Sequence, residues 1–179
     1  MSILSCFYPD EYLDSTYVID FDALYRAGYR GVIFDIDNTL FPQGAPADER
    51  ARALFGHLKE IGFDCCLLSN NQLPRIELFN QDIHVKFIEN AHKPSVKNYR
   101  KAMQMMGTNT GNTLFVGDQL FTDVYGARRT GIHSILVKPI HPKEEIQIVL
   151  KRFLERIVLR SYEKSQKKEK KVEKSSKLL

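Results

Sequence analysis

Two aspartates at the end of an apolar run are the residues of this chain best suited to chemistry. Asp35 and Asp37 follow the run Gly31–Phe34, and Thr39 comes two residues later. The run predicts a buried strand, and side chains at positions i and i+2 share a face wherever a strand continues. One carboxylate could attack an electrophile while the other transfers protons, and either could help to bind a metal ion.

Polar groups also follow three later strand patterns. They are Ser69, Asn70 and Asn71 after the second apolar run, then Lys93 in His-Lys-Pro-Ser, then Asp118 and Asp123 in Gly-Asp-Gln-Leu-Phe-Thr-Asp. Because the carboxyl ends of parallel strands lie at one edge of a sheet, we expect these groups to lie near Asp35. Asn70 and Asn71 either contact a substrate or shape the loop.

This set of side chains suits phosphate transfer. A carboxylate attacks an anionic phosphoryl group poorly unless the charge is screened, and Lys93 with a divalent metal ion would supply that screening. Ser69 and backbone amides near it could hold the non-bridging oxygens. Oxygen ligands from Asp35, Asp118 and Asp123 suit Mg²⁺ rather than zinc.

Helix and strand patterns alternate along the chain. We expect helices over residues 20–25, 54–61, 74–79, 95–106, 123–129 and 142–162, and strands over 31–35, 63–69, 85–88, 113–116 and 132–137. Residues 1–18 show no clear period. The alternation predicts an α/β fold, a Rossmann-like three-layer sandwich with a mostly parallel sheet.

The positive charge is concentrated at the carboxyl terminus. The chain of 179 residues has a net charge of +4, but residues 164–179 contain seven lysines and two glutamates, a balance of +5, so residues 1–163 sum to −1. This distribution argues against a nucleic-acid-binding face on the body. We expect one domain over residues 1–163 and a disordered lysine-rich tail over 164–179.

The cysteines and the amino terminus indicate the compartment. Cys6, Cys65 and Cys66 are an odd number, and the adjacent pair lies in an apolar run as ordinary core residues. We expect a reducing compartment, no signal peptide and no membrane span. The expected location is cytoplasmic, with peripheral membrane contact as an open alternative.

The motifs, in this order, resemble the haloacid dehalogenase (HAD) superfamily of phosphatases. Asp35-Ile-Asp37-Asn-Thr39 matches the first motif, Ser69 the second, Lys93 the third, and Gly117-Asp118 with Asp123 the fourth. The resemblance covers residues 31 to 138. Each motif is weak alone, but four in order at βα-unit spacing are specific.

The resemblance implies roles for these residues. Asp35 would be the nucleophile that forms an aspartyl-phosphate, and Asp37 the general acid and base. Thr39, Ser69, Asn70 and Lys93 would bind the phosphoryl group. Mg²⁺ would be held by Asp35, Asp118 and the backbone carbonyl of Asp37, with Asp123 as a direct or indirect ligand.

The residues of the four motifs are similar to those of the YqeG-type branch of HAD phosphatases. That branch resembles phosphatases acting on phosphatidylglycerophosphate. This similarity implies a lipid phosphate as the leading substrate. Independently, neither Leu40–Asp48 nor the interval from Ser69 to Lys93 has room for a cap domain. We therefore expect an open site, suited to a large substrate, to one presented at a surface, or to closure by a partner.

The apolar stripe of the last predicted helix has two possible interpretations. The stripe comprises Ile146, Val149, Leu150, Phe153, Leu154, Ile157 and Val158, beside Lys151, Arg152, Arg156 and Arg160. Packing on the sheet explains the stripe, and we favour it. A basic amphipathic helix followed by a lysine-rich tail also fits weak attraction to an anionic membrane.

Three alternatives to a lipid phosphatase remain to be compared. A phosphatase of soluble metabolites or phosphoproteins would use the same residues. A signalling receiver domain would need its acceptor aspartate after a later strand, and the chain has Ser69 there. A non-catalytic binding module has little support, because every core catalytic residue of the family pattern is present.

Overall fold

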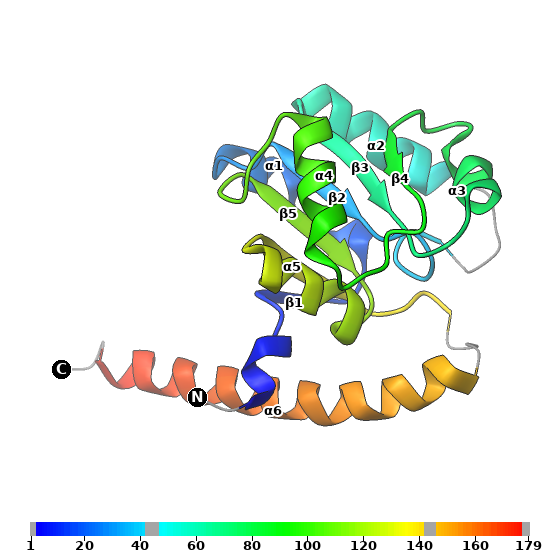
Figure 1. The fold of residues 1–179 in the computed structure, drawn as a ribbon. Coiled ribbons are helices and arrows are strands. Elements are labelled where there is room, and N and C mark those ends of the chain that lie inside the picture. The colour runs from blue at the N-terminus through cyan, green and yellow to red at the C-terminus, as the bar shows by residue number, and fades with distance from the viewer. Residues whose placement is uncertain (1–2, 42–46, 142–145, 177–179) are drawn as a thin grey trace.

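The computed structural model describes residues 3–41, 47–141 and 146–176. Its centre is a six-stranded sheet in the order β1-β6-β5-β2-β3-β4, in which every neighbouring pair is parallel (Figure 1). The strands are β1 (Glu11–Leu13), β2 (Gly31–Phe34), β3 (Asp64–Leu68), β4 (Lys86–Ile88), β5 (Thr113–Gly117) and β6 (His133–Val137). The strand order reverses between β2 and β5, and open α/β sheets bind ligands at the carboxyl ends beside such a point.

Helices cover both faces of this sheet. They are α1 (Phe21–Arg26), α2 (Glu49–Ile61), α3 (Leu73–Asn80), α4 (Val96–Met106), α5 (Tyr125–Thr130) and α6 (Ile146–Ser176), with short turns η1 (Ile3–Phe7), η2 (Thr16–Val18) and η3 (Leu120–Val124). Phe34 packs in a core with Phe55 of α2, whereas Ile33 packs in a separate core with Tyr99 of α4. The alternation along β2 therefore fills both layers, and the predicted three-layer α/β fold is confirmed.

Local signals set several helix boundaries. Asp20 caps α1 by accepting the Ala23 N–H at 2.8 Å, and Asp48 caps α2 by accepting the Ala51 N–H at 2.9 Å. The helix predicted over 54–61 therefore begins five residues earlier, at Glu49. Gly62 ends α2 with a φ of 105°, a left-handed conformation that favours glycine. Cys65 and Cys66 are buried and unbridged, as predicted for core residues.

The amino-terminal segment contains a strand that the sequence pattern did not reveal. β1 has three residues and pairs with β6 at the sheet edge, where Tyr12 lies opposite Leu136. Such a short strand has no measurable alternation, and its partner lies more than 100 residues away. Long-range pairing, rather than local propensity, therefore creates β1.

The carboxyl-terminal helix differs from the prediction in length. We expected a helix over 142–162 and disorder from Lys164, but α6 continues without a break to Ser176; residues 142–145 lie outside the described part. Residues 163–176 are too polar to bury, yet they lack proline and glycine and are rich in lysine and glutamate, which favour helices. Among the described helices, none is long and apolar enough to cross a membrane.

The predicted absence of a cap agrees with the described segments. The interval between Ser69 and Lys93 holds only α3, β4 and their loops. In the first interval, residues 42–46 lie outside the described part, and Ala47 and Phe41 on either side are buried in the core.

Candidate active site

Asp35 follows the last residue of β2 and lies at the centre of the site. Its backbone N–H donates to the carbonyl of Val116 on β5 at 2.9 Å, which fixes the residue beside the switch point. Its carboxylate is buried. The Lys93 ammonium donates to one carboxylate oxygen, and the Thr39 hydroxyl donates to the other at 3.3 Å.

The turn after Asp35 folds the chain back on the site. Asn38 has a φ of 61°, a left-handed value that asparagine tolerates better than most residues. The turn brings the Thr39 hydroxyl within 3.4 Å of Asp118 as well. From η2, the Thr16 hydroxyl donates to the Thr39 carbonyl at 2.8 Å, and the Tyr17 hydroxyl donates to the Leu40 carbonyl. The amino-terminal segment thus positions the first motif.

Asp118 and Asp123 come from the end of β5 and from η3. The π-helical turn brings Asp123 back toward the strand end, where its carboxylate accepts the Gln119 N–H at 3.0 Å. A Cβ on Gly117 would lie 2.6 Å from the Asp123 carboxylate, so only glycine permits this approach. The sequence predicted a helix from Asp123, and the structure begins the turn three residues earlier.

Lys93 and Ser69 complete the cluster from the β3–β4 side. The Lys93 ammonium lies 2.8 Å from the Asp123 carboxylate in addition to its contact with Asp35. Asn70 accepts the backbone N–H of Lys93 at 2.8 Å, so it shapes the loop that carries this lysine. Ser69 is buried after β3, and its hydroxyl accepts the Asn71 N–H at 3.1 Å. The structure therefore brings the predicted residues to one edge.

The cluster carries an excess of negative charge. Oxygens of Asp35, Asp118 and Asp123 lie within 4.8 Å of one another, and all three residues are buried. Burial, with a contribution from Asp123, raises the pKa of Asp35 to about 7 against the opposing effect of Lys93. Burial lowers the pKa of Lys93, but Asp123 and Asp35 outweigh it and raise that pKa overall. Three hard oxygen donors around uncompensated charge fit a divalent cation such as Mg²⁺.

The Asp37 carboxylate lies outside that cluster. Arg75 on α3 donates to one of its oxygens at 2.6 and 3.1 Å, and Asn71 donates to the other. The resemblance assigned Asp37 to the metal through its backbone carbonyl, so that assignment stays a prediction. Sequence reasoning missed Arg75; its position in the first turn of the helix after the second motif was the available signal.

A second missed residue is Glu155 on α6. It is buried, and its carboxylate accepts the N–H of Leu120 at 2.7 Å, two residues after Asp118. A cavity of about 160 Å³ beside this contact is lined by Asp118, Leu120, Glu155 and Arg156 among others. No motif marks Glu155, because its role depends on how α6 lies against η3.

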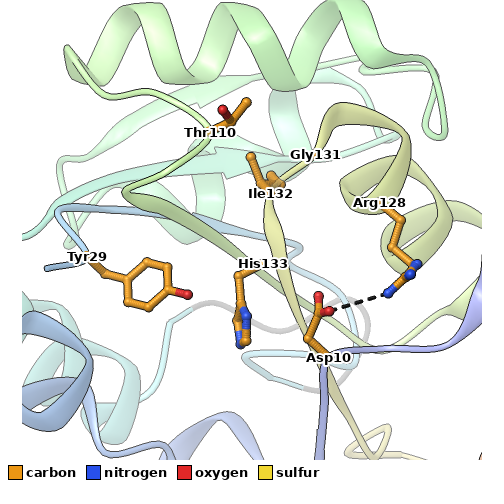
Figure 2. A pocket seen from close by; sticks show the side chains of 7 residues that line it. All are labelled: Asp10, Tyr29, Thr110, Arg128, Gly131, Ile132 and His133. Atoms are coloured by element: carbon orange, nitrogen blue, oxygen red, sulfur yellow. Dashed lines mark hydrogen bonds and ion pairs between the residues drawn. The ribbon is translucent and has the colours of Figure 1, made fainter. Parts of the chain in front are cut away.

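A cavity of about 310 Å³ lies at the opposite edge of the sheet. Figure 2 shows its lining residues, which include Tyr29 before β2, His133 at the start of β6, and the ion pair between Asp10 and Arg128 at 3.3 Å. These residues are at or near the amino ends of strands. The cavity is therefore separated from the Asp35 cluster by the length of the sheet.

Comparison with known proteins agrees with the motifs. The HAD-hydrolase-like family model matches residues 90–145. The chain is 34% identical over 154 residues to the probable phosphatase YqeG of Bacillus subtilis strain 168, covering 86% of this chain and 90% of that protein. It is 28% identical over 147 residues to phosphatidylglycerophosphate phosphatase 1, chloroplastic/mitochondrial, of Arabidopsis thaliana, covering 73% of this chain and 40% of that protein.

A solved structure supports the fold. The putative HAD superfamily (subfamily III A) hydrolase from Legionella pneumophila superposes with a TM-score of 0.51 at 14% identity, covering 68% of this chain and 72% of that one. At this identity the likeness concerns the fold alone. The YqeG match over most of both sequences, together with the HAD-hydrolase-like family model, shows that the chain belongs to the HAD superfamily of phosphatases, in the branch that contains YqeG.

Proposed function

We propose that this phosphatase hydrolyses phosphate monoesters with Mg²⁺ as its cofactor and with Asp35 as a transiently phosphorylated nucleophile. The observation that carries the proposal is the buried cluster at the β2–β5 switch point, where Asp35 contacts Lys93 and lies within 4.8 Å of Asp118 and Asp123 at their carboxylate oxygens. Clusters of carboxylates around a single ammonium are costly to bury, so this arrangement is best explained by function.

In the first step, a carboxylate oxygen of Asp35 attacks phosphorus, and the bond from phosphorus to the ester oxygen breaks. A proton carried by Asp37 passes to the departing alkoxide, and the alcohol leaves. Lys93, which contacts Asp35, and the hydroxyl of Ser69, which follows the neighbouring strand β3, would bind the non-bridging oxygens. Charge stabilisation of this kind is often the largest contribution to catalysis.

In the second step, the Asp37 carboxylate takes a proton from water, and the water oxygen attacks phosphorus. The bond between phosphorus and Asp35 breaks, which releases inorganic phosphate and restores the carboxylate. Arg75 and Asn71 hold the Asp37 carboxylate, two residues after Asp35, and Asp37 would serve both proton transfers. One residue, Asp37, would therefore act as the general acid in the first step and as the general base in the second.

The cofactor would be held by Asp35, Asp118 and Asp123, together with the backbone carbonyl of Asp37. When bound, Mg²⁺ would neutralise charge on the transferring phosphoryl group and on the carboxylates around it. Thr39 supports this site, because its hydroxyl lies within 3.4 Å of both Asp35 and Asp118.

Phosphatidylglycerophosphate is the leading substrate. The Arabidopsis relative carries that activity in its name, and a second relative from Chlamydomonas reinhardtii does so as well. The described segments contain no cap, so the site suits a phosphate on a large lipid head group. Peripheral contact with the membrane would follow from such a substrate, because its acyl chains stay in the bilayer.

The test is a comparison of catalytic efficiency on phosphatidylglycerophosphate in vesicles with that on soluble sugar phosphates and phosphopeptides. Each substrate is assayed with Mg²⁺ and after exhaustive chelation. The proposal predicts metal-dependent release of phosphate and a preference for the lipid. A wide preference for soluble phosphates would overturn the lipid substrate, and full activity after chelation would overturn the cofactor.

A further inference from the structure

The outer face of α6 exposes large apolar side chains. Phe153 is 58% exposed, Leu154 48% and Ile157 48%, whereas Glu155, Val158 and Tyr162 on the same helix are buried against the body. The expectation that the whole apolar stripe packs on the sheet is therefore wrong for these three residues. A helix has only one side against the body, and the stripe is wide enough to reach past it.

The same face becomes basic toward the carboxyl end. Phe153 and Ile157 are followed at spacings of three or four residues by Arg160, Lys164 and Lys168, all exposed. Residues at this spacing form one row along a helix. The row is thus apolar in its first part and cationic in its second.

The charge of α6 contrasts with that of the body. Residues 146–176 contain ten lysines and arginines and four glutamates, a balance of +6. Residues 1–145 contain fifteen lysines and arginines and eighteen aspartates and glutamates, a balance of −3. An anionic surface would therefore attract the helix and repel the body. Only an approach with α6 foremost would be favourable.

The inner face of α6 connects this surface to the active site. Glu155 accepts the Leu120 N–H beside Asp118, and Arg156 lines the cavity that Asp118 also lines. The hydroxyl of Tyr8, the residue after η1, lies 2.6 Å from the Ser161 hydroxyl on the same side. In Figure 1, α6 runs along one side of the body and projects past it. Its apolar part is therefore the part nearest the site.

We propose that α6 is the surface by which the protein docks on an anionic lipid bilayer. Phe153, Leu154 and Ile157 would enter the boundary between head groups and acyl chains, and the basic row would lie along the head groups, as amphipathic helices do at membranes. The inference deepens the proposed function and rests on it for the purpose of docking. The Glu155 contact would then hold the site beside the membrane.

Charge separates this partner from a second copy of the chain. Two α6 helices packed together through this face would bring two charges of +6 close together. An anionic bilayer offers the opposite charge over the whole length of the helix. The observations therefore favour lipid over self-association.

The test measures binding of the full chain to vesicles that contain no substrate. Sedimentation with neutral phosphatidylcholine vesicles is compared with sedimentation with vesicles that also contain phosphatidylglycerol. We expect binding only to the anionic vesicles, and weaker binding as salt rises. The double variant Arg160→Gln/Lys164→Gln should bind about 30-fold more weakly at low salt, and Phe153→Gln/Ile157→Gln about tenfold or more.

The matched control is Val18→Gln/Met105→Gln, which changes two exposed apolar residues outside α6 and should bind as the unaltered protein does. Equal loss in the control, or equal binding of neutral and anionic vesicles, would overturn the proposal. Sedimentation equilibrium without lipid tests the rival partner. A dimer that the Phe153→Gln/Ile157→Gln variant dissociates would assign this face to a second copy.

Docking and catalysis can fail separately. Because the vesicles contain no substrate, binding is measured even if the lipid phosphatase activity is absent. The α6 variants should retain full turnover of a small soluble phosphate ester, since they leave the Asp35 cluster intact. Vesicle binding without turnover of the lipid would overturn the proposed substrate alone, and turnover without binding would overturn the docking surface alone.

Discussion

The active-site edge of the sheet and the outer face of α6 both carry lysine, but the lysine of the first is buried and paired, whereas those of the second are exposed to solvent. Lys93 has a side chain only 4% exposed, and it contacts the carboxylates of Asp35 and Asp123. Lys164 and Lys168 are exposed on α6, on a helix with an excess of positive charge. Buried charge requires specific partners from the same chain, whereas exposed charge is available to an outside partner.

The largest effect should come from the buried side of this comparison. Asp35→Asn removes the anionic oxygen that attacks phosphorus, so we expect a loss of at least ~10⁴-fold in kcat. Asp64→Asn is the matched control, because Asp64 is the first residue of β3, at the opposite sheet edge, and pairs with half-buried Lys86. Circular dichroism should show both variants folded. Near-normal turnover by Asp35→Asn would remove Asp35 from the nucleophile role.

The second-largest effect should come from the acidic cluster, whose loss should change how activity depends on Mg²⁺. Asp118→Ala removes one of three clustered carboxylates, so the Mg²⁺ concentration needed for half-maximal activity should rise at least tenfold and kcat should fall ~10²-fold. Titration of activity with Mg²⁺ after chelation measures both. An unchanged Mg²⁺ requirement would mean that Asp118 is not a ligand.

Arg75 lies between the two regions in exposure and should give an intermediate effect. Arg75→Ala frees the Asp37 carboxylate from its main partner, so proton transfer should suffer and kcat should fall ~10- to 100-fold. Arg50→Ala, which removes an exposed arginine paired with Asp48, serves as the control. A change in KM alone would indicate that Arg75 binds substrate and does not position Asp37.

Glu155 should give the smallest effect on chemistry and a measurable one on stability. Glu155→Ala leaves the buried N–H of Leu120 without this acceptor, which should cost ~1–3 kcal/mol of unfolding free energy. Glu155→Gln keeps an acceptor oxygen and should lose less. Urea denaturation compares the two, and equal stability of both variants with the parent would show that this contact does not anchor α6.

The sequence predicted the residues of the site better than their supports. Asp35, Ser69 and Asp118 each follow a strand whose apolar run is visible in the sequence, and parallel pairing brings such strand ends together. Neither Arg75 nor Glu155 follows an apolar run of this kind, and each acquires its role from the way a helix lies against a neighbouring loop. The contact between Glu155 and Leu120 spans 35 residues.

The same limit applies to fold elements. Capping by Asp20 and the left-handed Gly62 are local, so the start of α1 and the end of α2 could be predicted, whereas α2 starts at Glu49, five residues before the predicted helix. β1 could not, because three edge residues take their conformation from β6. In α6, periodicity revealed an apolar stripe but not which part of it the body covers. The polar composition from Lys164 onward predicted disorder, whereas the helix continues to Ser176.

The most direct test of the central claim is to trap the phosphorylated intermediate in the Asp37→Asn variant. Loss of the proton donor and acceptor should slow turnover ~10²- to 10⁴-fold and allow the intermediate to accumulate. Rapid quenching and borohydride reduction, followed by peptide mass spectrometry, identify the phosphorylated aspartate. We predict that Asp35 is reduced to homoserine, and only when Mg²⁺ and substrate are both present. Reduction at another residue, or none while phosphate is still released, would contradict the mechanism.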